Sequence, residues 1–192
     1  MDYNKILDAY YNSNKPIINN ININNFASFI YVINHWSQIL GLLISKCDNH
    51  KKRKNIVYNL YDENCESYTH VETFYLFLLE LGFNKKIDEI ENTTYGVLYM
   101  RLLTDIISEN NFNECCQILG SIEYIYQKIS SDIIQWFIKK YNKMPENHFT
   151  MHETLDITHA KDFFELNEKE INETALIIGA DWIIGIVKEI TN

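Results

Sequence analysis

Proline is almost absent from this sequence of 192 residues. The two prolines are Pro16 and Pro145, so residues 17–144 contain none, and the whole chain has only six glycines. A sandwich or barrel of short strands needs many turns, and turns usually contain Gly or Pro. No segment alternates apolar and polar residues with a period of two. The sequence therefore predicts an all-α protein built from long helices.

The composition is that of one globular domain. Hydrophobic residues make up 46% of the chain and charged residues 22%, both close to the average for folded proteins. The length suits a single hydrophobic core, and neither an internal repeat nor a linker-like segment divides it. We expect residues 1–192 to form one helical domain, with residues 1–20 as a candidate short, loosely packed N-terminal segment.

Apolar residues recur at helical spacing along most of the chain, and Asn or Ser residues precede several of these runs as candidate N-caps. Pro16 and Pro145 end two of the runs. This pattern predicts about seven helices, with approximate limits of 25–47, 51–81, 94–109, 114–128, 132–142, 148–166 and 168–190, and residues 5–12 as a candidate short helix before them.

The charge and cysteine content exclude several classes of protein. The net charge is −9 and the pI about 5.1, and an acidic surface repels the phosphates of nucleic acid. The four cysteines contain no CxxC pair, so neither a zinc ribbon nor a disulfide framework is expected. No signal peptide is recognisable, and the apolar stretches near Ile39–Ile44 and Ala175–Ala180 are too short to span a bilayer. We therefore expect a cytoplasmic protein without a nucleic-acid or membrane partner.

A His-x3-Asp-x2-His motif formed by His152, Asp156 and His159 carries the strongest chemical signal. At about 100° per residue these three side chains fall within about 60° of one another on one helix face. Leu155 and Phe163 lie on or beside that face, which indicates that it points inward. Buried imidazoles and a carboxylate are costly unless satisfied, and iron, manganese or zinc would satisfy them. The alternative is a surface pair of histidines with a nearby aspartate.

Three further residues are candidate ligands. Glu63 and His70 are two helical turns apart and share a face, although Glu66, one turn before His70, competes with Glu63 as a ligand. Glu123 lies in an otherwise apolar helix, where a lone carboxylate would be costly, unless it lies on a polar face near Lys128. His148, one turn before His152, is a possible additional ligand.

Together these stretches resemble the haem-oxygenase-like di-iron oxidase and oxygenase family, which shares its fold with the PqqC and TenA proteins. The resemblance rests on Leu60-Tyr61-Asp62-Glu63 leading to His70, on Glu123, and on the motif from His152 to Ala160, and it covers about residues 25–190. It implies a haem-oxygenase-like helical bundle that binds two iron ions, or one manganese and one iron, and uses dioxygen as co-substrate. The six ligands that it implies are Glu63, His70, Glu123, His152, Asp156 and His159.

One branch of this family looks closest, that of the chlamydial death-domain-associating protein, a 4-aminobenzoate synthase that consumes its own tyrosine side chain. That branch has a lysine about ten residues after the mid-chain glutamate, where this chain has Ile133, and Lys128 is the nearest lysine. The chain also has Cys65 and Ser67 where family members often have glycine. Whether a lysine or a tyrosine is consumed stays open at this point.

The resemblance implies a dioxygen-dependent oxidoreductase that acts on a small metabolite, such as an amino acid, an amine or a fatty acid, in a biosynthetic pathway. Tyr68, Phe74 and Tyr126 are candidates to line the substrate site. One alternative is a 4-aminobenzoate synthase that uses a tyrosine side chain. The other is a helical interaction or effector module with a structural or vestigial metal site and a protein partner. A homodimer is compatible with each.

Overall fold

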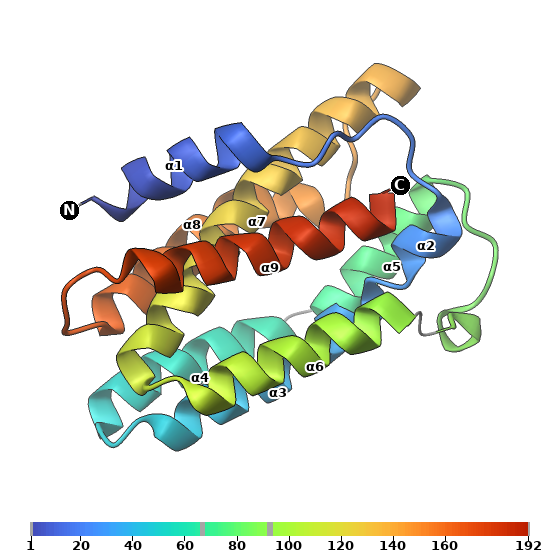
Figure 1. The fold of residues 1–192 in the computed structure, drawn as a ribbon. Coiled ribbons are helices and arrows are strands. Elements are labelled where there is room, and N and C mark those ends of the chain that lie inside the picture. Colours follow the sequence, from blue (N-terminus) through green and yellow to red (C-terminus); the bar gives the residue numbers. More distant parts are fainter. Residues whose placement is uncertain (1, 66–67, 92–93, 192) are drawn as a thin grey trace.

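The structure, a computed structural model, describes residues 2–65, 68–91 and 94–191, apart from the side chain of Cys65. These residues form α-helices and one short 3-10 helix and contain no strand, which confirms the predicted all-α class (Figure 1). The number of helices is slightly higher than expected. The elements are α1 (Tyr3–Asn14), α2 (Ile23–Ala27), α3 (Ile30–Lys46), α4 (His50–Cys65), α5 (His70–Glu80), η1 (Ile87–Glu89), α6 (Thr94–Glu109), α7 (Phe112–Tyr141), α8 (Phe149–Leu166) and α9 (Glu173–Thr191).

The helix predicted at 51–81 is in fact two helices. α5 begins after Thr69, whose side chain accepts a hydrogen bond from the Glu72 amide while the Glu72 carboxylate accepts one from the Thr69 amide. This reciprocal arrangement is a capping box, which satisfies amide groups that a new helix leaves unpaired. The consequence for the site is that His70 is the first residue of a new helix.

The two helices predicted at 114–128 and 132–142 form one continuous helix, α7. Ser130 and Ser131, either of which the sequence predicts as the N-cap of the second helix, lie inside α7, and the Ser131 hydroxyl donates to the Glu153 carboxylate at 2.8 Å. α7 ends at Asn142, which adopts a left-handed conformation with φ 54°, a common way to terminate a helix. A long central helix therefore runs through the bundle.

α7 packs mainly against α8 and α9, while α3 packs against α4, α5 and α6. In Figure 1, α9 runs beside α7, and α3, α4 and α6 lie together along the opposite side of the bundle. A Cβ atom on Gly179 of α9 would lie 2.2 Å from the backbone oxygen of Ile118 in α7. The two helices thus approach to a distance that only glycine allows at this position.

α1 is packed onto the bundle. Leu7 and Tyr11 are buried, and the Tyr11 hydroxyl donates to Asp132 of α7 at 2.9 Å. In the opposite direction, the Tyr124 hydroxyl of α7 donates to Asp8 at 2.8 Å. Of the expected loose N-terminal segment, the part within α1 is therefore held by the core, and residues 17–20 are mostly exposed.

Ile23–Lys46 is long and apolar enough to cross a membrane by length and composition, with a mean hydropathy of 1.3 over its most apolar window. This segment, which contains α2 and α3, is longer than the two apolar stretches identified from the sequence. Half of the window is buried inside the bundle, where α3 contributes Trp36, Leu40 and Leu43 to the core. A core helix of a soluble protein satisfies the same test.

Candidate metal centre

Four helices bring the six candidate ligands into the interior. Glu63 lies in the last turns of α4, His70 is the first residue of α5, and Glu123 lies near the middle of α7. His152, Asp156 and His159 share the inward face of α8. None of the six side chains is more than 8% exposed. The alternatives of a surface histidine pair and of a solvated Glu123 are therefore wrong.

Glu63, Glu123 and His159 form the most compact group of possible ligands. Each offers one ligand atom, and these three atoms lie within 4.8 Å of one another. The three residues come from α4, α7 and α8, so the group exists only because the helices pack together. Two carboxylates and an imidazole are donors that iron, manganese and zinc accept, and the group could hold one such ion.

The other three candidates lie beside this group. His70 Nδ1 is 2.5 Å from Glu63 Oε2, and His152 Nδ1 is 2.7 Å from Asp156 Oδ1. The rings of His70 and His152 meet edge to face, with centroids 4.7 Å apart. The structure thus brings all six candidates into one continuous cluster.

Several buried polar atoms of this cluster have no hydrogen-bond partner among the described residues: His152 Nε2, Asp156 Oδ2 and both ring nitrogens of His159. His159 Nε2 lies 3.5 Å from Asp62 Oδ2, at the outer limit of a hydrogen bond. An unsatisfied buried polar group costs about 1–3 kcal/mol. A metal ion would satisfy these atoms together, so the residues present fit a metal site.

The electrostatics of the cluster favour a cation in the same way. Burial raises the pKa of Glu123 well above its ordinary value, and the nearby Asp156 and Glu63 raise it further, against a hydrogen bond from Trp36 that lowers it. Burial and Glu63 also raise the pKa of Asp156, against the influence of His70. A bound cation would relieve this crowding of carboxylates.

Burial favours the neutral form of His152 and His159, which is the form of imidazole that binds metals. Burial lowers the pKa of His152 to about 3, and His70 acts in the same direction against Glu63. Burial also lowers the pKa of His159, although Glu63 and Asp62 oppose it. Protons therefore compete poorly with a metal for these imidazoles.

A cavity of about 50 Å³ adjoins the cluster, enough room for a few water-sized molecules. Glu63, His70, Glu123 and His152 form its polar wall. The other lining residues are mostly apolar or aromatic, and about half of them belong to α3 and α9. The remaining lining residues are Phe29, Val32, Ile33, Trp36, Ile122, Tyr126, His148, Trp182 and Ile183.

Two of the three expected lining residues lie at or near this cavity. Tyr126 lines it, and the buried ring of Phe74 packs edge to face on His148 with centroids 5.0 Å apart. Tyr68 does not contribute, because it is 60% exposed. Trp36 also lines the cavity, but the sequence does not predict it as a site residue, since its helical spacing does not distinguish it from an ordinary core aromatic.

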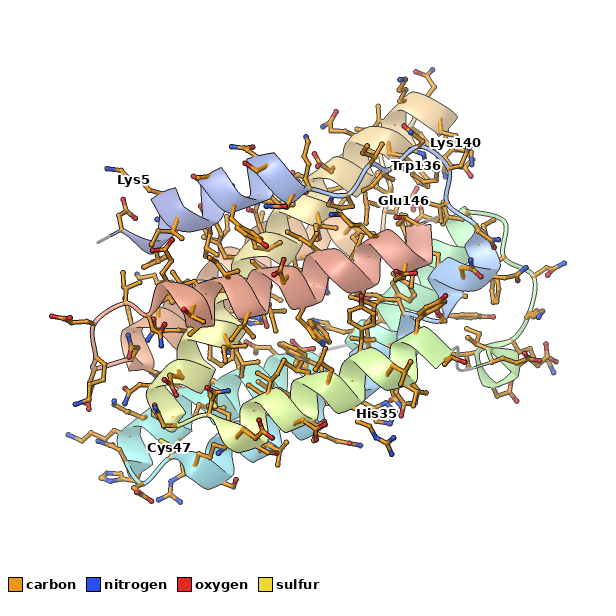
Figure 2. All side chains as sticks on the ribbon, in the orientation of Figure 1. Lys5, His35, Cys47, Trp136, Lys140 and Glu146 are labelled. Atoms are coloured by element: carbon orange, nitrogen blue, oxygen red, sulfur yellow. The ribbon has the colours of Figure 1, made fainter. Side chains whose placement is uncertain are left out.

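The other open candidates lie elsewhere. Lys128 pairs with Asp8 of α1 at 2.8 Å, away from the cluster, and Ile133 is a buried core residue. Glu66, the competitor of Glu63, lies outside the described residues. His35, a histidine outside the candidate set, is on the outer side of α3 (Figure 2), with Nδ1 2.7 Å from the Tyr31 carbonyl oxygen of its own helix.

His148 is buried at 1% exposure and lies next to the cluster, with its ring centroid 4.3 Å from that of His152. Both of its ring nitrogens have protein partners. Nε2 is 2.9 Å from the Tyr126 hydroxyl, and Nδ1 is 3.2 Å from the Thr73 hydroxyl. These two bonds distinguish it from His152 and His159.

A scan against protein-family models gives no match to this sequence, and a search of curated proteins gives none either. The chemistry of the site therefore rests on the residues themselves and on how they are placed.

Proposed function

We propose that the protein is a cytoplasmic, dioxygen-activating non-haem di-iron oxidoreductase with a haem-oxygenase-like fold, acting on a small metabolite. The observation that carries this proposal is the group of Glu63, Glu123 and His159, whose ligand atoms lie within 4.8 Å of one another. His70, His152 and Asp156 extend that group through direct bonds and ring contacts. The sequence resemblance to di-iron oxidases points to the same six residues.

Three imidazoles and three carboxylates form a mixed nitrogen and oxygen donor set that suits iron(II), with a manganese–iron pair as an equally compatible content. Two iron(II) ions bound there would supply the electrons for reduction of dioxygen. The three carboxylates would offset most of the positive charge of two divalent ions.

The surrounding side chains contact the ligands and make most of the cavity apolar. Trp36 lies close enough to Glu123 to lower the pKa of its carboxyl group, against the effect of burial. The ring of His152 contacts the rings of both His70 and His148. Most of the other residues that line the cavity are apolar or aromatic, including Phe29 and Trp182. Apolar surroundings that keep water from a bound metal would limit unproductive loss of an oxidant.

Metal analysis tests this proposal directly. After anaerobic loading with iron(II), native mass spectrometry should find two irons per chain, and exposure to oxygen should produce a transient visible absorption. His152→Gln should bind fewer irons and lose the absorption, whereas His35→Gln, on the outer side of α3, should behave like the wild type. Wild-type protein that binds no iron under these conditions would refute the proposal.

A second candidate function, a 4-aminobenzoate synthase-like enzyme that uses its own tyrosine, is favoured by Tyr126. The side chain of Tyr126 already lines the cavity. The cavity volume of about 50 Å³ is about one third of that of an engineered cavity that binds benzene, so the cavity has no room for a second aromatic ring beside Tyr126. Rescue of a 4-aminobenzoate auxotroph by the gene, lost in Tyr126→Phe and retained in Tyr124→Phe, would support it. Failure to rescue would count against it.

A further inference from the structure

We propose that His148 is a positioning residue rather than a metal ligand, and that it holds the phenol of Tyr126 with the hydroxyl proton turned away from the cavity. The cavity wall at Tyr126 is then a hydrogen-bond acceptor. The effect of this acceptor on a substrate rests on the proposed function. The hydrogen-bond arrangement itself is independent of the proposed function, because it involves only residues of α5, α7 and the start of α8.

The direction of the bonds follows from Thr73. Its hydroxyl donates to the backbone carbonyl of His70 at 3.0 Å, and a threonine hydroxyl has one proton to give. We infer that Thr73 gives this proton to the carbonyl, the shorter of its two contacts, so that Nδ1–H of His148 is the donor in the contact of 3.2 Å with Thr73 Oγ1. A neutral imidazole carries a proton on only one nitrogen, so Nε2 of His148 is an acceptor.

Tyr126 completes the chain of bonds. Its oxygen lies 2.9 Å from His148 Nε2, and because that nitrogen accepts, the phenol proton points at His148. The remaining lone pairs of the Tyr126 oxygen are left for the cavity. Of the described residues that line the cavity, none is Lys or Arg, so a molecule that enters meets an acceptor at Tyr126 and no cation apart from any bound metal.

The backbone at His148 supports a specific role for this side chain. Its φ is 51° and its ψ −79°, a region that residues other than glycine rarely adopt. Strained conformations of this kind are retained where the surrounding structure needs them, often at functional sites. The His148 carbonyl accepts the Met151 and His152 amides at 3.0 Å, so the same residue starts α8 and places the ring between α5 and α7.

The ring is also confined on several sides. Phe74, Phe149 and His152 surround it, with ring centroids 5.0, 4.9 and 4.3 Å away. With both nitrogens bonded and the ring enclosed, His148 would have to break the bond to Tyr126 or the bond to Thr73 before it could bind a metal. His152 and His159 need no such rearrangement, since each has a buried nitrogen without a hydrogen-bond partner in the described structure.

The first experiment uses metal-free protein labelled with 15N-histidine and reads imidazole tautomers by long-range 15N–1H correlation spectra. The resonances of His148 are those that disappear in His148→Gln, and we expect them to show a protonated Nδ1 and an unprotonated Nε2. Tyr126→Phe should shift its Nε2 resonance, and Thr73→Val should shift its Nδ1 resonance. The controls are Tyr124→Phe and Thr104→Val, which remove equivalent hydroxyls from α7 and α6 and should leave both resonances in place. A protonated Nε2, or the absence of either shift, would overturn the proposal.

The second experiment titrates cobalt(II) as a spectroscopic probe. His148→Gln should bind as many cobalt ions per chain as the wild type, whereas His152→Gln should bind fewer. If His148→Gln loses a cobalt ion as His152→Gln does, His148 is a ligand and the proposal is wrong. If the wild type binds neither cobalt nor iron, the di-iron proposal fails, and the tautomer spectra alone decide the role of His148.

Discussion

The Nδ1 atom of His152 lies 2.7 Å from Oδ1 of Asp156, one turn further along α8, and the two side chains are 8% and 0% exposed. The other atom of each group, His152 Nε2 and Asp156 Oδ2, is buried without a hydrogen-bond partner in the described structure. Each side chain thus uses one polar atom for the bond within the pair and has a second one that can bind a metal ion.

Replacement of Asp156 by Asn tests this arrangement. The amide keeps the size of the side chain and one acceptor oxygen but removes the charge. Loss of a group that orients a metal ligand lowers metal affinity by about 10–100-fold, and loss of a ligand should lower it at least as much. We therefore expect the affinity for iron(II) to fall at least about tenfold. Competition with a chelator measures the change. The control is Asp105→Asn on the exposed side of α6, and equal affinities in the two variants would contradict the prediction.

The metal cluster shows how far the sequence could be interpreted. The motif of His152, Asp156 and His159 predicted a shared inward face because three positions on one helix depend only on helical geometry. The proximity of Glu123 depends instead on how α7 packs on α4 and α8, which no spacing in the sequence determines. The bond between His148 and Thr73, 75 residues apart, has no local signal at all.

The errors in the helix limits have local causes. The T-x-x-E pattern at Thr69 and Glu72 marks a helix start, but the apolar spacing continues across it and favours a single helix. At Ser130 and Ser131 the sequence predicts a helix start where α7 in fact continues. Serine is frequent at caps, but inside a helix it bonds to a carbonyl one turn back or to a neighbouring helix, as Ser131 does with Glu153.

Glu123→Gln should make the metal-free protein more stable at neutral pH. Burial and the neighbouring carboxylates raise the pKa of Glu123, so the charged form is disfavoured only in the folded state. Such a group stabilises the fold below its ordinary pKa of about 4.5, and this stabilisation is lost as the pH rises. We expect a gain of about 1 kcal/mol or more in the free energy of unfolding at pH 7.

Urea denaturation at pH 7 and pH 4 measures this effect, and the advantage of Glu123→Gln should shrink at the lower pH. The exposed Glu109→Gln is the control. With saturating iron(II) the order should reverse, because binding to the folded state stabilises it in proportion to affinity, and the variant lacks one donor. A variant that is less stable than the wild type in the absence of metal would refute this account of the charge cluster.

The close approach of α9 to α7 gives a prediction about stability alone. Gly179→Ala would place a Cβ atom 2.2 Å from the Ile118 carbonyl oxygen, and because that oxygen belongs to the backbone, the helices must separate. We expect a loss of about 1–3 kcal/mol. At Gly41, on the exposed side of α3, a Cβ atom meets nothing within 4 Å, so Gly41→Ala should stabilise the protein by about 0.5–1 kcal/mol. Thermal unfolding of both variants tests the contrast, and similar losses at both sites would contradict it.

The anchoring of α1 through Tyr11 predicts a dependence on alkaline pH. Burial raises the pKa of Tyr11, and Asp132, which accepts its hydroxyl at 2.9 Å, raises it further. A tyrosine with a raised pKa in the folded state stabilises the fold fully below pH 10 and loses that contribution as the pH rises, because the unfolded chain ionises first. Below pH 10, Tyr11→Phe should cost about 1 kcal/mol for the lost hydrogen bond. The difference between wild type and variant should then narrow from pH 9 to pH 11 in thermal unfolding, whereas the exposed Tyr58→Phe should show no such trend. A constant difference across this range would mean that Tyr11 ionises equally in both states and that Asp132 does not hold its proton.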